Sequence, residues 1–130
     1  MEGNALDIYI ERVRTVSAKY SERAGEGQQP GWRTDRGRIY LMRGEPTQLV
    51  DRPVARDGSP PYQIWQYSTS PGYVYLFLDE SRFGNYRLIF TTDPNQSTLP
   101  GWESRVGPDA LQDLNRVGVR GVGRVRGSGN

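Results

Sequence analysis

The spacing of apolar residues predicts an amphipathic helix near the start of the chain, over residues 5–24. The apolar positions recur every three or four residues and form one stripe: Leu6, Tyr9, Ile10, Val13, Val16 and Tyr20. Asn4 is a suitable N-cap for this helix, and Gly25 is a suitable stop. Amphipathic helices of globular proteins usually face their own core, so we expect the stripe to be buried in the domain.

Shorter alternating segments predict four strands, at residues 38–43, 62–68, 73–78 and 86–91. In the third segment, aliphatic side chains share one face and aromatic side chains share the other. A strand with two apolar faces is expected at the centre of a sheet, or with its aromatic face under a helix or a partner. Residues 47–61 are polar and interrupted by prolines, which predicts a loop.

The end of the chain predicts a short helix over residues 108–116, with Pro108 in its first turn. Residues 118–130 are rich in Gly, Arg and Val, show no period, and are not expected to form structure alone. The predicted architecture is α+β: an N-terminal amphipathic helix packed on an antiparallel sheet of about four strands, a short C-terminal helix and an extended Gly/Arg tail. We therefore expect a single domain over residues 1–117, followed by a tail over 118–130.

The absence of two residue types limits the possible chemistry. The 130 residues contain no Cys and no His, which excludes disulfides, Cys or His zinc sites, a Cys nucleophile and an imidazole base. Catalysis would have to use carboxylates, Arg, Tyr, Ser or Thr, and we assign no catalytic residue, cofactor or metal. The longest apolar run, Val74–Leu78, is too short to cross a bilayer. The start lacks the features of a secretory signal, which predicts a cytoplasmic protein, free or at the cytoplasmic face of a membrane.

Charge is distributed unevenly along the chain. The net charge is +2, but residues 116–130 contain four Arg and no acid, so the preceding part is slightly acidic. A Gly/Arg tail is one feature of nucleic-acid binding, and aromatic residues can stack on bases. The folded part shows no basic face in the sequence, which makes nucleic-acid binding an alternative function here and not the leading one.

Residues 31–37, Gly-Trp-Arg-Thr-Asp-Arg-Gly, predict a structural turn. The two Gly allow backbone conformations that other residues avoid, and Thr34 and Asp35 can accept hydrogen bonds from nearby backbone N–H groups. Trp32 is expected to bury its ring over the sheet. Arg36 or Arg38 can pair with a neighbouring carboxylate.

The same region allows a second hypothesis, a pocket lined by Asp35, Arg36 and Glu45. Carboxylates beside an Arg can bind an anion, or transfer protons if burial raises a carboxylate pKa. Nearby charged residues at positions 79, 80 and 82 can join them: Asp79, Glu80 and Arg82. A small ligand-binding protein or enzyme is therefore a further alternative, although no spacing specifies a reaction.

The motif and the segments after it resemble the GWxTD domain, a bacterial family named for this motif and largely without assigned function. The similarity covers roughly residues 5–92 and includes Ile64–Tyr67, Leu76–Asp79 and Phe83–Leu88. The motif positions are Gly31, Trp32, Thr34, Asp35, Gly37, Gly44 and Pro46. A weaker similarity is to the small accessory lipoprotein of bacterial outer-membrane protein assembly. Its fold packs helices on a three-stranded antiparallel sheet, and it is a scaffold.

We expect a non-catalytic accessory subunit that presents an aromatic/Arg surface and an extended tail to a bacterial multi-subunit, membrane-associated complex and stabilises it. Envelope, secretion and photosynthetic machinery fit equally well. The expected partners are other protein subunits and an anionic membrane surface. The expected interaction residues are aromatic or Arg: Tyr73, Tyr75, Phe77, Arg116, Arg120, Arg124 and Arg126.

Overall fold

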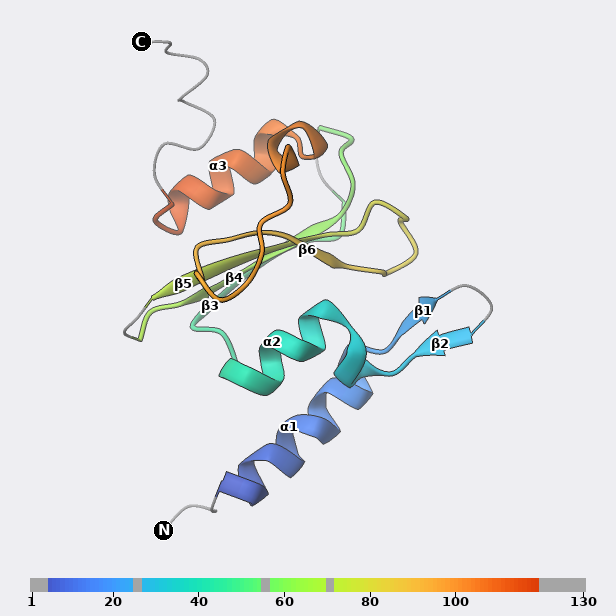
Figure 1. The fold of residues 1–130 in the computed structure, drawn as a ribbon. Coiled ribbons are helices and arrows are strands. Elements are labelled where there is room, and N and C mark those ends of the chain that lie inside the picture. Colours follow the sequence, from blue (N-terminus) through green and yellow to red (C-terminus); the bar gives the residue numbers. More distant parts are fainter. Residues whose placement is uncertain (1–4, 25–26, 55–56, 70–71, 120–130) are drawn as a thin grey trace.

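A four-stranded antiparallel sheet lies between two layers of helices (Figure 1). The computed structural model describes residues 5–24, 27–54, 57–69 and 72–119. One face of the sheet carries the first two helices, and the other face carries the third. The helices are α1 (Ala5–Lys19), α2 (Asp35–Arg43) and α3 (Pro108–Arg116), with two 3-10 turns, η1 (Gly31–Arg33) and η2 (Trp102–Arg105). The predicted α+β class and the four-stranded antiparallel sheet are confirmed.

The strands of the sheet follow one another in chain order: β3 (Gln48–Arg52), β4 (Tyr62–Tyr67), β5 (Tyr73–Leu78) and β6 (Arg87–Thr91). β5 has a neighbour on both sides, which confirms its predicted central place. A bulge between β5 and β6 leaves Ile89 without an opposite residue, so Ile89 and Phe90 both pack on the α3 side. A separate small hairpin joins β1 (Glu22–Ala24) to β2 (Gly27–Gln29).

Two predicted elements are wrong. Residues 38–43 form most of α2 and not a strand, because Thr34 caps a helix that ends at Gly44, whose φ is +79°. The strand that takes the place of residues 38–43 in the sheet is β3. It lies within residues 47–61, which the sequence predicts to be a loop. β3 is an edge strand with mostly exposed residues, so it lacks the apolar alternation that identifies a half-buried strand.

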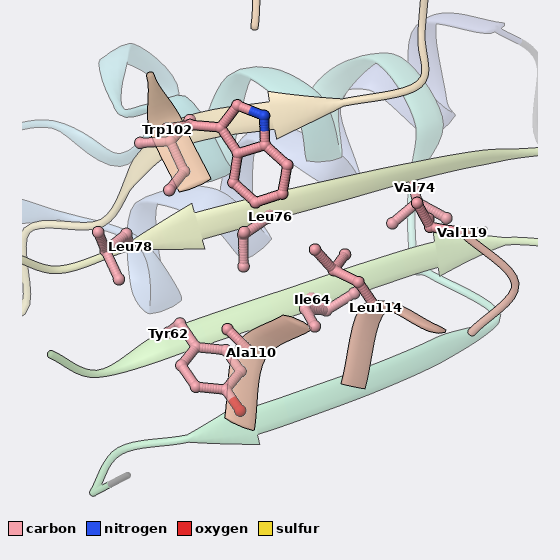
Figure 2. Packing of buried hydrophobic residues seen from close by; sticks show 10 residues of the cluster. Tyr62, Ile64, Val74, Leu76, Leu78, Trp102, Ala110, Leu114 and Val119 are labelled. Carbon is pink, nitrogen blue, oxygen red and sulfur yellow. The ribbon is translucent and has the colours of Figure 1, made fainter. Parts of the chain in front are cut away.

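Each face of the sheet has its own hydrophobic cluster. On the α3 side the cluster is mainly aliphatic, and Ala110 and Leu114 of α3 cover Ile64 and Leu76 of the strands (Figure 2). Trp102 of η2 closes one end of this cluster, against Phe90, with ring centroids 4.5 Å apart. On the α1 and α2 side the cluster is largely aromatic: Val16, Ile39, Tyr40, Trp65, Tyr67, Tyr75 and Phe77.

Only part of α1 takes part in the second cluster. The helix ends at Lys19 rather than near residue 24, because residues 22–24 pair as β1. Val16 is the buried residue of α1, whereas Leu6 and Tyr9 are exposed. The expectation that the whole apolar stripe faces the core is therefore wrong for its N-terminal half. None of the helices in the described part of the chain has the length and apolar character needed to cross a membrane.

Candidate functional site

Residues 31–37 form the joint between α1, α2 and β6. The backbone of Gly31 lies against α1, since a Cβ at this position would lie 1.7 Å from the carbonyl oxygen of Val16. A Cβ on Gly37 would lie 1.7 Å from the carbonyl oxygen of Gly31. Neither glycine is among the described residues with positive φ. Space, rather than the unusual conformation expected from the sequence, therefore requires glycine at these two positions.

Thr34 and Asp35 fix this joint by hydrogen bonds, as the structural-turn hypothesis predicts. The buried Thr34 hydroxyl donates to the carbonyl of Gly31 (2.8 Å) and accepts from the N–H of Gly37 (3.0 Å). It is the N-cap of α2. The Asp35 carboxylate accepts from the N–H of Leu88 in β6 (2.8 Å) and therefore ties the start of α2 to the sheet.

Arg36 is buried beside Glu22 between two tyrosine rings. Its guanidinium lies 3.3 Å from the Glu22 carboxylate, 4.9 Å from the Tyr20 ring centroid and 4.1 Å from that of Tyr86. Burial raises the pKa of Glu22, outweighing the opposing effect of Arg36. Burial also raises the pKa of Tyr20 to about 12. Arg36 is thus held by the fold, through an ion pair and two cation–π contacts.

Asp35, Arg36 and Glu45, the residues expected to line a pocket, are each engaged by a different partner in the structure. Asp35 is engaged by Leu88, Arg36 by Glu22, and the Glu45 carboxylate accepts from the Tyr40 hydroxyl at 3.1 Å. Cavities of about 770 and about 180 Å³ lie elsewhere, beside the end of α3 and between β3 and α3. Within the described ranges, no cluster of three or more acidic side chains could hold a metal ion.

The acidic residues expected to join this pocket belong to a different loop. Asp79 is buried and its carboxylate accepts from the N–H groups of Arg82 (2.9 Å) and Gly84 (2.7 Å). These bonds hold Arg82 at a φ of +65°, a conformation that few non-glycine residues adopt. Glu80 pairs with Arg105 of η2 at 3.0 Å. Asp79 and Glu80 therefore serve this loop and its contact with η2.

Trp32 differs from the rest of the motif because its side chain faces solvent. The residue is 48% exposed, whereas Gly31, Thr34 and Arg36 are buried. The prediction that Trp32 packs over the sheet is wrong: with Gly31 pressed against α1, the next residue of the 3-10 turn lies on the outer side. The guanidinium of Arg33 lies 5.1 Å from the Trp32 ring centroid. Residues 31–37 therefore form a segment that is fixed to α1 and β6 and carries an exposed Trp–Arg pair.

The aromatic residues expected to form a docking surface lie inside the domain. Tyr75 and Phe77 are 0% exposed, because α1 and α2 cover this face of the sheet. The Tyr75 hydroxyl donates to Asp93 (2.7 Å) and accepts from Arg43 (2.9 Å). Tyr73 is half-buried, with the Arg43 guanidinium 4.7 Å from its ring centroid. The docking role predicted for Tyr75 and Phe77 is therefore wrong.

The predicted interaction arginines fall into two groups. Arg116 lies on α3, where its exposed side chain contacts the carboxylate of Asp113 at 3.1 Å. The remaining three, Arg120, Arg124 and Arg126, lie outside the described residues.

No family model, curated protein or solved structure matches the chain. The resemblance to the GWxTD domain thus stays a prediction, based on the motif residues and the segments that follow them.

Proposed function

We propose that this chain is a non-catalytic accessory subunit of a larger protein assembly, and that Trp32 with Arg33 is its docking site. The observation that carries the proposal is the exposed indole of Trp32 on a segment whose other residues are fixed by the fold. Trp and Arg are the residue types most enriched among the energetic centres of protein interfaces. A backbone segment that the fold already fixes loses little conformational entropy on binding.

The exposed part of Trp32 is sufficient for a substantial contribution to binding. About half of the indole side chain, roughly 100 Å², is available for burial, which corresponds to about 2–3 kcal/mol of apolar burial. Arg33 adds a positive charge beside the ring, so an apolar pocket with an acidic rim is the partner surface that fits best.

Two features of the sequence support a particular kind of assembly. The resemblance to the GWxTD domain supports a bacterial complex, and the four Arg after residue 115 support a contact with an acidic or anionic surface. A small-ligand or enzymatic function at residues 31–37 receives no support from the geometry, since Asp35, Arg36 and Glu45 are each engaged by the fold.

Site-specific photo-crosslinking in cells that naturally contain the chain tests the proposed docking site. A photoreactive phenylalanine analogue replaces Trp32 in one variant and Phe83 in the control, because Phe83 is 78% exposed but lies on another loop, between β5 and β6. We expect a defined protein adduct from position 32 and none of the same mass from position 83. Absence of an adduct at position 32, or the same adduct from both positions, would overturn the proposal.

A truncation after Val119, which keeps this buried residue of the α3-side cluster, tests the role of the Arg-rich end separately. If this end supplies a second contact, the truncated chain recovers the same partner in lower yield, and high salt reduces the difference between the two forms. Recovery that depends on nuclease-sensitive material would instead favour the nucleic-acid alternative.

A further inference from the structure

The N-terminal half of α1 extends beyond the rest of the domain with its apolar side chains exposed. Figure 1 shows this end of the helix pointing away from the sheet. Leu6 is 63% exposed, Tyr9 53% and Ile10 42%, whereas Val16 on the same helix is fully buried. Single exposed apolar residues are ordinary, but several on one face of a protruding helix indicate a surface that a partner covers.

These exposed residues continue the buried stripe of α1. At 100° per residue, the side chains of Tyr9, Val13, Leu6 and Ile10 lie within an arc of about 100° on the helix. Met42, at the end of α2, is also exposed and lies near the middle of α1. The Arg12 guanidinium links the two helices there by donating to the carbonyls of Leu41 (3.0 Å) and Met42 (3.3 Å).

We propose that a second copy of this chain covers the exposed stripe by antiparallel packing of the two α1 helices. A twofold axis between Tyr9 and Ile10 places Leu6 opposite Val13 of the partner subunit and Tyr9 opposite Ile10 of the partner subunit. The N-terminal end of each α1 then lies over the middle of the other, near the exposed Met42. This arrangement uses the same patch on both copies, as a closed twofold dimer requires.

Charge along α1 is compatible with the antiparallel orientation. The first half of the helix carries Asp7, Glu11 and Arg12, and Arg14 and Lys19 follow in the second half. Asp7 and Arg14 are seven residues apart and therefore lie on the same flank of the stripe. Antiparallel packing about this axis brings the same flank of the two copies together and places each Asp7 near Arg14 of the partner subunit. Such exposed pairs add little affinity, so the buried apolar area is the main contribution to dimerisation.

The available area fits a dimer that dissociates on dilution. The exposed parts of Leu6, Tyr9, Ile10 and Met42, with their neighbours, amount to roughly 500 Å² per copy, or about 1,000 Å² in total, near the lower limit of specific interfaces. The inference is independent of the proposed docking at Trp32, which lies at the other end of α1, beside Val16. If both hold, the dimer presents two Trp32 side chains and gains affinity by bivalence.

Sedimentation of the full chain, from about 1 µM to about 1 mM, tests the dimer. We expect the wild-type chain to change from monomer to dimer over this range, and Ile10→Asp to raise the dissociation constant at least about 50-fold. Ile8→Asp is the matched control: Ile8 is 45% exposed on the same helix but lies about 160° around it from Ile10, so dimerisation should stay within about twofold of wild type. A wild-type chain that stays monomeric, or equal effects of the two substitutions, would overturn the inference.

The lack of Cys allows a second test of the geometry. Ile10→Cys places one thiol of each copy next to the twofold axis, whereas Ile8→Cys places both thiols away from it. Mild oxidation should give disulfide-linked dimers of the first variant and leave the second without a disulfide link. Equal cross-linking of the two variants would contradict the antiparallel arrangement. Failure here with a specific Trp32 adduct in cells would leave the proposed function standing and remove only the dimer.

Discussion

Replacing Gly31 with alanine tests the claim that the motif fixes α1 to the rest of the fold. The new Cβ would lie 1.7 Å from the carbonyl oxygen of Val16 and 2.4 Å from its carbonyl carbon. Both contacts are with backbone atoms of α1, so no side-chain rotation relieves them, and the helix has to move by more than about 1 Å. Overpacking of this kind costs about 3 kcal/mol. For a domain of this size the melting temperature should fall by roughly 10 °C.

A matched glycine substitution separates this clash from the general cost of alanine. Gly58 has a φ of +80° and open space around its missing side chain, so Gly58→Ala should cost only about 1 kcal/mol of conformational strain. Urea unfolding, followed by circular dichroism, measures both variants against the wild-type chain. If Gly31→Ala is no more destabilising than Gly58→Ala, α1 is not held against residues 31–33 in the way described.

Three further predictions concern the buried Tyr–Asp–Arg networks on the two faces of the sheet. Asp113→Asn should lower the free energy of unfolding by about 2 kcal/mol in urea titrations, since Asp113 binds the Tyr62 hydroxyl at 2.6 Å and Arg52 at 3.0 Å. Tyr75→Phe should cost about 1–2 kcal/mol in the same assay by leaving the buried Asp93 carboxylate with one partner fewer. Burial opposes ionisation of Asp93 and Asp113, but their hydrogen bonds from Tyr and Arg hold each pKa below its ordinary value of 3.8. The stability from this effect is therefore complete above about pH 5 and lost as the pH falls below about 4, and a pH series of unfolding curves should show a smaller acid loss for Asp113→Asn.

Much of the sheet could be predicted from local pattern alone. β5 places aliphatic side chains on one face and aromatic side chains on the other, and β4 alternates Ile64 against Trp65 and Tyr67; both faces are covered as this pattern requires. α3 was recognisable from Pro108 in its first turn and the apolar contacts that follow. The sequence of each of these elements therefore indicates both its secondary structure and which of its faces are buried.

α2 and β3 illustrate what the pattern could not provide. The continuous apolar run from Ile39 to Met42 fits either period, and the information that selects the helix lies outside it, at Thr34 and Gly44. β3 exposes most of its side chains, and its position depends on backbone pairing with β4, which leaves no periodic signal.

The candidate site was only partly predictable for a similar reason. Hydrogen bonding by Thr34 and Asp35 follows from their short polar side chains beside a helix start. The exposure of Trp32 does not, because it depends on how closely Gly31 approaches Val16, and no spacing in the sequence reports that contact. Likewise, the apolar stripe of α1 does not indicate which of its residues are covered by the rest of the domain and which are exposed.

Binding of Trp32→Ser to the partner recovered by crosslinking tests the proposed docking site most directly. Phe83→Ser is the control, since it removes a more exposed aromatic ring from another loop. We predict that Trp32→Ser unfolds at the wild-type urea concentration but binds the partner roughly 30- to 160-fold more weakly, as expected for about 2–3 kcal/mol of lost burial, while Phe83→Ser binds normally. Unchanged affinity of Trp32→Ser, or an equal loss in both variants, would contradict docking through Trp32.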